Sequence, residues 1–425
     1  MGGVALDPVL PGAHRRRGRA RGSGARGGAR GIPPGRAHPV SRPAAQTLPD
    51  TTPAALAATL LRGAFLVALT LPSVRRGFGA SGLGWAYLVA LAFALALVSV
   101  PLVRALARWW GVLDTPAARK VHAVATPLLG GAAVYAAFAA TVLFNFTFSL
   151  TLKGVALGAT IVVGIGVLDD LLDVPARWKL AGQVVAVAVA MSYGVVLDTI
   201  PTAWPGSYAI NLVLTLLWFL MVTNALQFLD GMDGLAAGLG AIAALFFSLA
   251  ALQTNQPYLM FLAAPLVGAC LGFLPYNFRF GRPATIFLGD AGASFIGFTL
   301  AGLAVMGEWA ENDFIGLLTP VLILAVPLFD IAFVGTVRIV TGKVHSFGEW
   351  LAYTARDHIH HRFEALGLTR TETVLLIFFI AATLGLSAML LKDATKHEAA
   401  LVLIQAGCVL AIIAVLEGVA RGRGR

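Results

Sequence analysis

Residues 154–173, GVALGATIVVGIGVLDDLLD, decide the fold class, because a run of apolar and small residues leads directly into a pair of aspartates. A helix of this length and composition crosses the hydrocarbon core of a bilayer. Further apolar spans occur at residues 85–105, 129–150, 180–197, 208–222, 235–252, 258–274, 293–306, 315–337, 373–391 and 399–416. We therefore predict an all-α, polytopic integral membrane protein with about eleven transmembrane helices and catalytic cytoplasmic loops.

The composition excludes an ordinary water-soluble protein. Of the 425 residues, 58% are apolar and only 12% are charged, whereas a soluble domain carries about a quarter charged residues. The net charge of +10 does not indicate nucleic-acid binding, because the cations lie in a short tail and in loops beside the spans. Cys270 and Cys408 fall inside apolar spans without a CxxC spacing, so we interpret them as small buried residues.

The basic residues of the loops predict the orientation. If the spans alternate in direction, Lys153, Lys392 and Lys396 lie on one side. The other side, predicted to be cytoplasmic by the positive-inside rule, collects Arg104, Arg108, Arg119, Lys120, Arg177, Lys179, Arg279, Arg282, Arg338, Lys343, Arg356, Arg362, Arg370, Arg421, Arg423 and Arg425. The acidic and histidine clusters of the chain, which are its candidate chemistry, fall on this same side. That asymmetry favours an enzyme over a transporter, which needs polar groups near the midplane.

The N-terminal part has a different composition. Residues 1–50 are rich in Arg, Gly, Ala and Pro, which predicts a disordered tail that the mature protein need not retain if translation starts downstream. Residues 51–84 hold an apolar segment, 53–71, that Arg62 interrupts, and then a linker. An extra span, an interfacial helix and a signal-like segment are the three interpretations of this segment.

A basic loop precedes the second span. Residues 113–131, LDTPAARKVHAVATPLLGG, place Arg119, Lys120 and His122 before a Thr-Pro step and a double glycine. Cations beside flexible glycine backbone suit a phosphate ligand. An ordinary positive-inside loop would contain the same residues, so this motif is weak by itself.

The aspartates Asp169 and Asp170 end the span quoted above, and Asp173 shares a helix face with Asp169. Adjacent carboxylates repel each other unless a cation compensates them, and Mg²⁺ takes carboxylate oxygens together with substrate phosphates. A solvated helix end is the alternative, although acids at a helix C-terminus oppose the macrodipole.

Two further motifs place acids at membrane boundaries. In residues 224–238, NALQFLDGMDGLAAG, four polar residues recur every third position and would form a polar stripe on a helix: Asn224, Gln227, Asp230 and Asp233. Polar groups at membrane depth are costly, which favours a functional role, although the glycines could mark only a turn. In residues 276–294, YNFRFGRPATIFLGDAGAS, Asp290 precedes an apolar span, where it could bind a metal or simply cap the helix.

A histidine-rich segment lies in the longest loop on the predicted cytoplasmic side. Residues 355–363, ARDHIHHRF, hold three histidines and two arginines. Zinc would need further Cys or His partners, so an anionic ligand such as a diphosphate is the better interpretation. Asp330 is an isolated acid in the ninth span; a neighbouring arginine could pair with it, and no role is assigned to it.

Taken together and in this order, the five motifs resemble the polyprenyl-phosphate N-acetylhexosamine phosphate transferase family over about residues 85–416. The H-x-H-H pattern is more similar to the branch that transfers N-acetylglucosamine phosphate to undecaprenyl phosphate than to the phospho-N-acetylmuramoyl-pentapeptide branch. The resemblance implies that residues 85–420 form the transferase domain, followed by a basic cytoplasmic tail at 421–425. It also implies an enzyme of the bacterial inner membrane whose active site faces the cytoplasm.

The resemblance also implies roles for individual residues. Asp169 and Asp170 would be catalytic, Asp290 would bind Mg²⁺, with Mn²⁺ as an alternative, and Gln227 stands where some members use a metal-binding Asn. Substrate binding is implied for Lys120, Asn224, Asp230, Asp233, Arg356, His358, His360 and His361. The Gln at 227, the Thr354-Ala355-Arg356 sequence before the histidines and the segment 343–350 depart from the family pattern.

The implied reaction transfers a HexNAc phosphate, preferentially GlcNAc phosphate, from a UDP-sugar to polyprenyl (undecaprenyl) phosphate and releases UMP. This would be the first membrane step of a cell-envelope glycan pathway, such as cell-wall or lipopolysaccharide biosynthesis. The alternatives are the same chemistry with UDP-MurNAc-pentapeptide, a transporter of an anionic or lipid-linked solute, and an inactive family member that only binds ligands. The predicted partners are the two substrates and membrane lipids, with no nucleic acid, and a homodimer stays open. Asp169 and Asp170 could act as base or nucleophile, but positioning of metal or substrate is favoured, because a phosphate monoester is largely dianionic at neutral pH.

Overall fold

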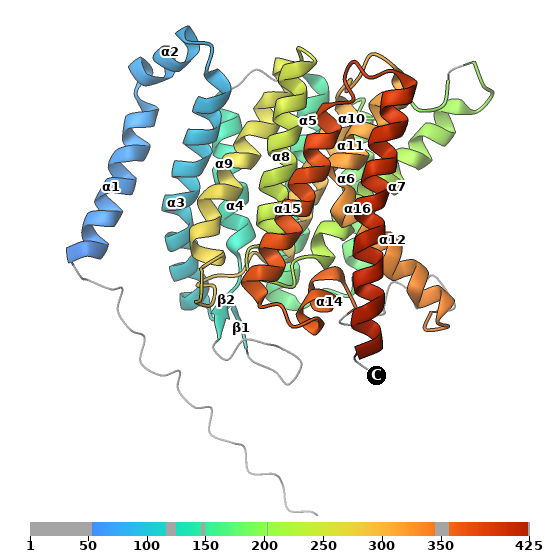
Figure 1. Cartoon of the computed structure of the whole chain (residues 1–425). Coiled ribbons are helices and arrows are strands. Elements are labelled where there is room, and N and C mark those ends of the chain that lie inside the picture. The colour runs from blue at the N-terminus through green and yellow to red at the C-terminus, as the bar shows by residue number, and fades with distance from the viewer. Residues whose placement is uncertain (1–52, 116–124, 146–148, 202, 345–356, 424–425) are drawn as a thin grey trace, which may run out of the picture. The chain divides into compact units, whose positions relative to one another are not determined.

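The computed structural model describes residues 53–115, 125–145, 149–201, 203–344 and 357–423, and these residues are almost entirely helical (Figure 1). Within them the only ladder is the two-residue antiparallel pairing of β1 (Leu113–Asp114) with β2 (Thr126–Pro127). The predicted all-α polytopic class is therefore confirmed. The tail predicted at residues 1–50 lies outside the described residues.

Each predicted apolar span overlaps at least one helix. The elements are α1 (Pro53–Thr70), α2 (Pro72–Ala80), α3 (Gly84–Trp110), α4 (Gly130–Phe144), α5 (Leu150–Leu172), α6 (Ala176–Ser192), α7 (Ser207–Phe228), α8 (Leu235–Gln253), the 3₁₀ turn η1 (Pro257–Leu259), α9 (Met260–Asn277), α10 (Gly289–Met306), α11 (Asp313–Ile323), α12 (Ala325–Val340), α14 (Ile359–Ala365), α15 (Arg370–Met389) and α16 (Lys396–Arg423). In the described residues, eight helices are long and apolar enough to cross a membrane, or up to ten if each of two bent pairs forms one span. The predicted spans at 129–150 and 180–197 correspond to the shorter α4 and α6.

Two proline residues account for the bent pairs. The span predicted at 315–337 is divided into α11 and α12, which meet at 82°. Pro327 has no N–H, and its ring would clash with the carbonyl of Ile323 in a straight helix, which favours a break at Leu324. Similarly, α1 and α2 meet at 64° because Pro72 holds Leu71 in an extended conformation (φ −67°, ψ 131°). The segment 53–71 is therefore helical but does not run straight into the next element.

Helices α8, α9 and α10 form the core of the helical bundle. In the most apolar 18-residue stretch of each of these helices, between 72% and 78% is buried, whereas the corresponding value for α16 is 17%. Helix α10 is therefore enclosed by protein, and α16 is largely exposed. Helix α10 contacts α4, α5, α7, α8 and α9. A bundle of apolar helices with its exposed apolar surface on the outside is the arrangement that lipid favours.

Glycines allow the backbones of three helices to meet where the polar motifs end. A Cβ atom on Gly131 of α4 would lie 2.0 Å from the Gly292 nitrogen of α10, and one on Gly166 of α5 would lie 2.3 Å from the Ala291 Cα. These contacts are closer than any side chain allows, so small residues are required there. The end of α5, which carries Asp169 and Asp170, is thereby placed against Asp290 at the start of α10.

We predict that Gly166→Ala destabilises the protein by about 1–3 kcal/mol, because the added methyl group forces α5 and α10 apart. Gly164→Ala, two residues earlier on the same helix, is the matched control, since a Cβ there meets nothing within 4 Å. The thermal unfolding midpoints of the two variants in detergent would test this. Equal midpoints for both variants would contradict the close contact of the two helices.

Candidate active site

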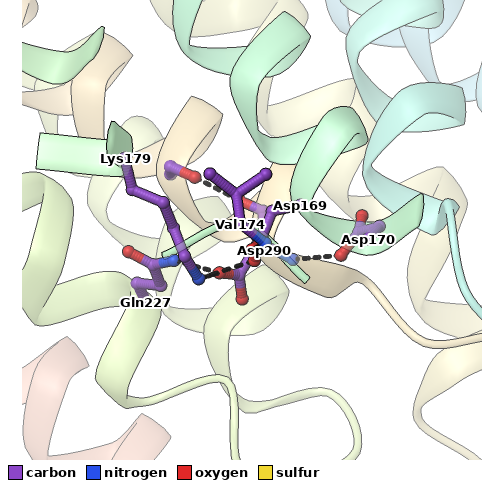
Figure 2. A network of polar contacts seen from close by, with 7 residues as sticks. Asp169, Asp170, Val174, Lys179, Gln227 and Asp290 are labelled. Carbon is purple, nitrogen blue, oxygen red and sulfur yellow. Dashed lines mark hydrogen bonds and ion pairs between the residues drawn. The ribbon is translucent and has the colours of Figure 1, made fainter. Parts of the chain in front are cut away.

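The two adjacent aspartates at the end of α5 have different partners. Asp169 Oδ1 accepts a hydrogen bond from the Val174 N–H at 2.8 Å, and its Oδ2 lies 2.6 Å from Lys179 Nζ (Figure 2). Asp170 Oδ1 accepts from the Asp290 N–H at 3.0 Å, while its Oδ2 is buried and has no hydrogen-bond partner in the described residues. The pair therefore bridges two different elements, because neighbouring residues of a helix point about 100° apart.

Lys179 holds this cluster together. Its Nζ lies 2.6 Å from Asp169 Oδ2 and 2.7 Å from Asp290 Oδ2, so one cation joins the end of α5 to the start of α10 (Figure 2). Burial opposes protonation of Lys179, but the Asp290 charge and hydrogen bonds to both carboxylates outweigh this effect and raise its pKa. Sequence reasoning counted Lys179 only among the loop charges. Its position, soon after the aspartate pair at the start of the next helix, was the available signal.

The turn that carries Asp290 is fixed by backbone contacts. Gly289 adopts φ +74°, and a Cβ there would meet Asp170 Oδ2 at 2.7 Å. The carbonyls of Phe287 and Leu288 accept hydrogen bonds from the N–H groups of Gly130 (3.0 Å) and Gly131 (2.7 Å). Asp290, predicted to precede the apolar span, lies inside the first turn of α10 and does not cap the helix; the helix dipole favours a carboxylate there.

The predicted polar stripe of the 224–238 motif is divided among several partners. Gln227 Nε2 donates to Asp290 Oδ2 at 2.5 Å, which brings this residue into the acidic cluster. Asn224 donates instead to Gln183 Oε1 at 2.9 Å. Asp233 Oδ2 accepts from the Ala284 N–H at 2.9 Å and so connects two loops.

Asp230 joins the acidic cluster from the loop between α7 and α8. Burial raises the pKa of Asp230 well above its usual value, and the nearby charges of Asp290, Asp170 and Asp233 add to this effect. A backbone hydrogen bond from Gly289 works in the opposite direction. Negative charge is therefore concentrated around the Gly289–Asp290 turn.

The histidine motif packs on the same loop. A Cβ on Gly231 would lie 2.4 Å from His360 Nε2, and neither ring nitrogen of the buried His360 has a hydrogen-bond partner in the described residues. The His358 and His360 rings are parallel at 6.2 Å, and His361 follows 4.2 Å from His360. Two motifs from distant parts of the sequence are thus brought together.

Asp330 is paired with a histidine, not with an arginine. Its Oδ2 lies 2.6 Å from His358 Nδ1, and its Oδ1 accepts from the Ile359 N–H at 2.7 Å. Arg338, two turns further along the same helix, forms a two-point ion pair with Asp357 at 2.9 and 2.6 Å. Burial raises the pKa of Asp357, but the hydrogen bond and charge of Arg338, together with His358 and Arg362, outweigh this effect and lower it.

Two predicted substrate-binding residues, Lys120 and Arg356, lie outside the described residues. The β1–β2 pairing flanks the loop that contains Lys120, and the Phe287 N–H donates to the Pro127 carbonyl at 2.9 Å. The base of that loop is therefore attached to the segment that leads into Asp290.

The acidic cluster has a donor set that fits a hard cation. In the described residues no three His, Cys, Asp or Glu side chains converge as a complete metal site. However, the Lys179 ammonium already occupies a cation position between Asp169 and Asp290, and Asp170 Oδ2 is a buried acceptor without a partner. Carboxylate oxygens with room for substrate phosphates are the environment that Mg²⁺ prefers.

Apolar helices that close around an acidic cluster at one end define a membrane-embedded enzyme, and the comparisons agree. Residues 152–308 match the family model described as glycosyl transferase family 4. A probable undecaprenyl-phosphate N-acetylglucosaminyl 1-phosphate transferase of Bacillus subtilis is 32% identical over 72% of this chain and 86% of its own length. A decaprenyl-phosphate N-acetylglucosaminephosphotransferase of Mycolicibacterium smegmatis is 31% identical over 75% and 85%, and a phospho-N-acetylmuramoyl-pentapeptide-transferase of Desulforudis audaxviator is 31% identical over 72% and 96%.

This chain belongs to glycosyl transferase family 4. The resemblance inferred from the five motifs is confirmed, and the chain is a transferase of the polyprenyl-phosphate type. The family is metal-dependent.

We predict that Lys179→Met lowers the free energy of unfolding by about 1–3 kcal/mol, because Asp169 and Asp290 then face each other without a cation. Arg177→Met is the matched control: it removes the same charge two residues earlier, where Arg177 is exposed and lies beside the Trp178 ring. Thermal unfolding in metal-free detergent solution would measure both. A Lys179→Met midpoint equal to that of Arg177→Met would show that the bridge does not stabilise the fold.

A second prediction concerns pH. Burial, with His361 and His358 adding to it, lowers the pKa of His360 well below its usual value, so the folded protein keeps this ring neutral. The unfolded chain takes up a proton on it below about pH 6.5, so stability should fall as the pH decreases from about 7.5 to about 5.5.

The variant His360→Gln should reduce this loss of stability, whereas His397→Gln, at an exposed position at the start of α16, should not. The thermal midpoint measured at both pH values gives the slope for each protein. Parallel slopes for wild type and His360→Gln would contradict a buried neutral imidazole.

Proposed function

We propose that this protein transfers GlcNAc phosphate from UDP-GlcNAc to a polyprenyl phosphate at the cytoplasmic face of a bacterial inner membrane. The products are a polyprenyl-diphospho-GlcNAc and UMP. The observation that carries the proposal is the Lys179 bridge between Asp169 and Asp290 at the end of apolar helices. The names of two relatives, which act on undecaprenyl or decaprenyl phosphate with an N-acetylglucosamine phosphate, support the substrates.

The proposed reaction exchanges one diphosphate bond for another. A phosphate oxygen of the lipid attacks the sugar-proximal phosphorus of the donor, the bond from that phosphorus to the UMP oxygen breaks, and UMP leaves with the electron pair. Both reactants are anions, so the main task of the protein is to compensate charge. Lys179 supplies one cation at the cluster, and the segment around Lys120 and the histidine motif would supply further donors to the phosphates.

The contacts of the aspartate pair favour positioning over proton transfer. Both oxygens of Asp169 are already engaged, one by the Val174 N–H and one by Lys179. Asp170 aligns the Asp290 turn through one oxygen and keeps the other without a partner. A lipid phosphate that is largely dianionic at neutral pH also leaves little proton to remove.

The cation that fits this donor set is Mg²⁺, with Mn²⁺ as the alternative. Asp290 would hold it, together with Asp170 Oδ2 and the amide oxygen of Gln227, whose Nε2 already contacts Asp290. When bound, the ion would polarise the diphosphate and neutralise developing charge. Gln227 keeps the amide oxygen of an Asn and reaches one methylene further.

The donor sugar distinguishes the two branches of the family. A relative that acts as a phospho-N-acetylmuramoyl-pentapeptide-transferase is 31% identical to this chain, so UDP-MurNAc-pentapeptide is the second candidate donor. Purified protein in detergent should release UMP from UDP-GlcNAc only when both undecaprenyl phosphate and Mg²⁺ are present. Release from UDP-MurNAc-pentapeptide alone would transfer the assignment to the other branch, and no release from either donor would reject the proposed activity.

We predict that Asp290→Asn lowers the rate of UMP release by about 100-fold or more and weakens the activation by Mg²⁺, because a carboxylate ligand is lost. Asp393→Asn is the control, since Asp393 is exposed in the loop between α15 and α16 and lies 3.8 Å from Lys392 Nζ. A titration of activity with Mg²⁺ measures both effects. An unchanged half-activating concentration in Asp290→Asn would contradict metal binding by this residue.

A further inference from the structure

We propose that Asp330 is a positioning residue for His358: it accepts the Nδ1–H of the imidazole and thereby presents Nε2 to the phosphate groups of the substrates. The inference rests on the proposed function for the identity of the ligand, but not for the geometry. It assigns a role to an acid that sequence analysis left without one.

The contact itself is specific. Asp330 Oδ2 lies 2.6 Å from His358 Nδ1, and Asp330 Oδ1 accepts from the Ile359 N–H at 2.7 Å. Only 1% of the Asp330 side chain is exposed, so no water competes for these two oxygens. A carboxylate can only accept, which means that Nδ1 must carry the proton. With its proton on Nδ1, the neutral ring has an acceptor at Nε2, and Nε2 becomes a second donor only when the ring is an imidazolium.

The remaining ring nitrogen is available. His358 Nε2 makes no hydrogen bond within the described part of the chain, and it is not among the buried polar atoms that lack a partner. The ring is held from its face by Phe228, stacked at 5.3 Å with an interplanar angle of 27°. Two contacts, one in the ring plane and one on its face, leave the imidazole little freedom to rotate.

The position of the ring connects it to the acidic cluster. Phe228 directly follows Gln227 at the end of α7, and the Gln227 amide donates to Asp290. The parallel ring of His360 packs on Gly231 of the loop after α7. The groups around His358 are thus two further imidazoles, His360 and His361, the Arg338–Asp357 ion pair and Arg362. A protonated Nε2 here would donate to a phosphate oxygen while Asp330 balances the imidazolium charge.

An isolated acid in a membrane helix is costly unless it has a function or a partner. Asp330 lies on α12, just after the break between α11 and α12. The break turns α12 away from the direction of α11 by 82°. In an uninterrupted span from 315 to 337, Asp330 would lie at a different position. The contact between Asp330 and His358 therefore depends on the bend.

The first test does not need turnover. In ¹⁵N-histidine-labelled protein, the His358 resonances, assigned by loss in His358→Gln, should show a protonated Nδ1, and Asp330→Asn should change this protonation pattern. Asp357→Asn removes a buried carboxylate from the same interface and should preserve the pattern, even if it lowers stability. A wild-type His358 with an unprotonated Nδ1 would overturn the proposal whether or not any variant folds.

The second test is a double-mutant cycle on UMP release. Asp330→Asn should lower kcat by about 10–100-fold, but should change kcat by less than about threefold in the His358→Gln background, because its effect passes through that ring. An equal loss in both backgrounds would mean that Asp330 acts independently of His358, and the positioning role would be rejected. Since the wild-type enzyme is assayed in parallel, absence of any UMP release would reject the proposed function and leave the NMR result to decide the role of Asp330.

Discussion

The structure depends on compensation of negative charge at one end of an apolar bundle. Asp169, Asp170, Asp230 and Asp290 converge around a single turn, and Lys179 places its ammonium between two of them. Such carboxylates repel strongly where water is scarce, so a nearby cation or a raised pKa is needed to keep them together. The same imbalance that constrains the fold makes the cluster suitable for a metal ion and for diphosphate chemistry. Both the fold and the proposed reaction therefore require positive charge at this cluster.

Close packing of the helices brings these aspartates together. Gly131 and Gly166 let α4 and α5 approach the backbone of α10, and Gly289 accommodates the Asp170 carboxylate above the turn. In lipid, where apolar side chains gain little by associating, close backbone approach is a main source of helix association. The aspartates are thus held by rigid elements and by backbone N–H groups, which reduces the reorganisation needed when charge develops in the reaction.

The histidine motif forms the second half of the site through different contacts. Its position is determined by Asp330, by the stacking of Phe228 on His358, and by the packing of His360 on Gly231. Helix α12 of the bent pair supplies Asp330, Phe228 is the last residue of α7, and Gly231 lies in the loop that follows α7. Loops that are distant in sequence meet at the end of the bundle where β1, β2, α14 and the C-terminal end of α16 also lie (Figure 1).

The sequence by itself determined the helical membrane class, the approximate spans, the family and the identity of the acidic and histidine motifs, because apolar runs and ionisable residues at their ends are local patterns. It did not reveal the role of Lys179, whose partners are up to 111 residues away, or the pairing of Asp330 with His358. It also merged α11 and α12 into one span, since hydropathy does not report the direction of a chain. Only the tertiary structure decided these features, because charge pairing and backbone proximity depend on which helices are neighbours, and no local pattern encodes that.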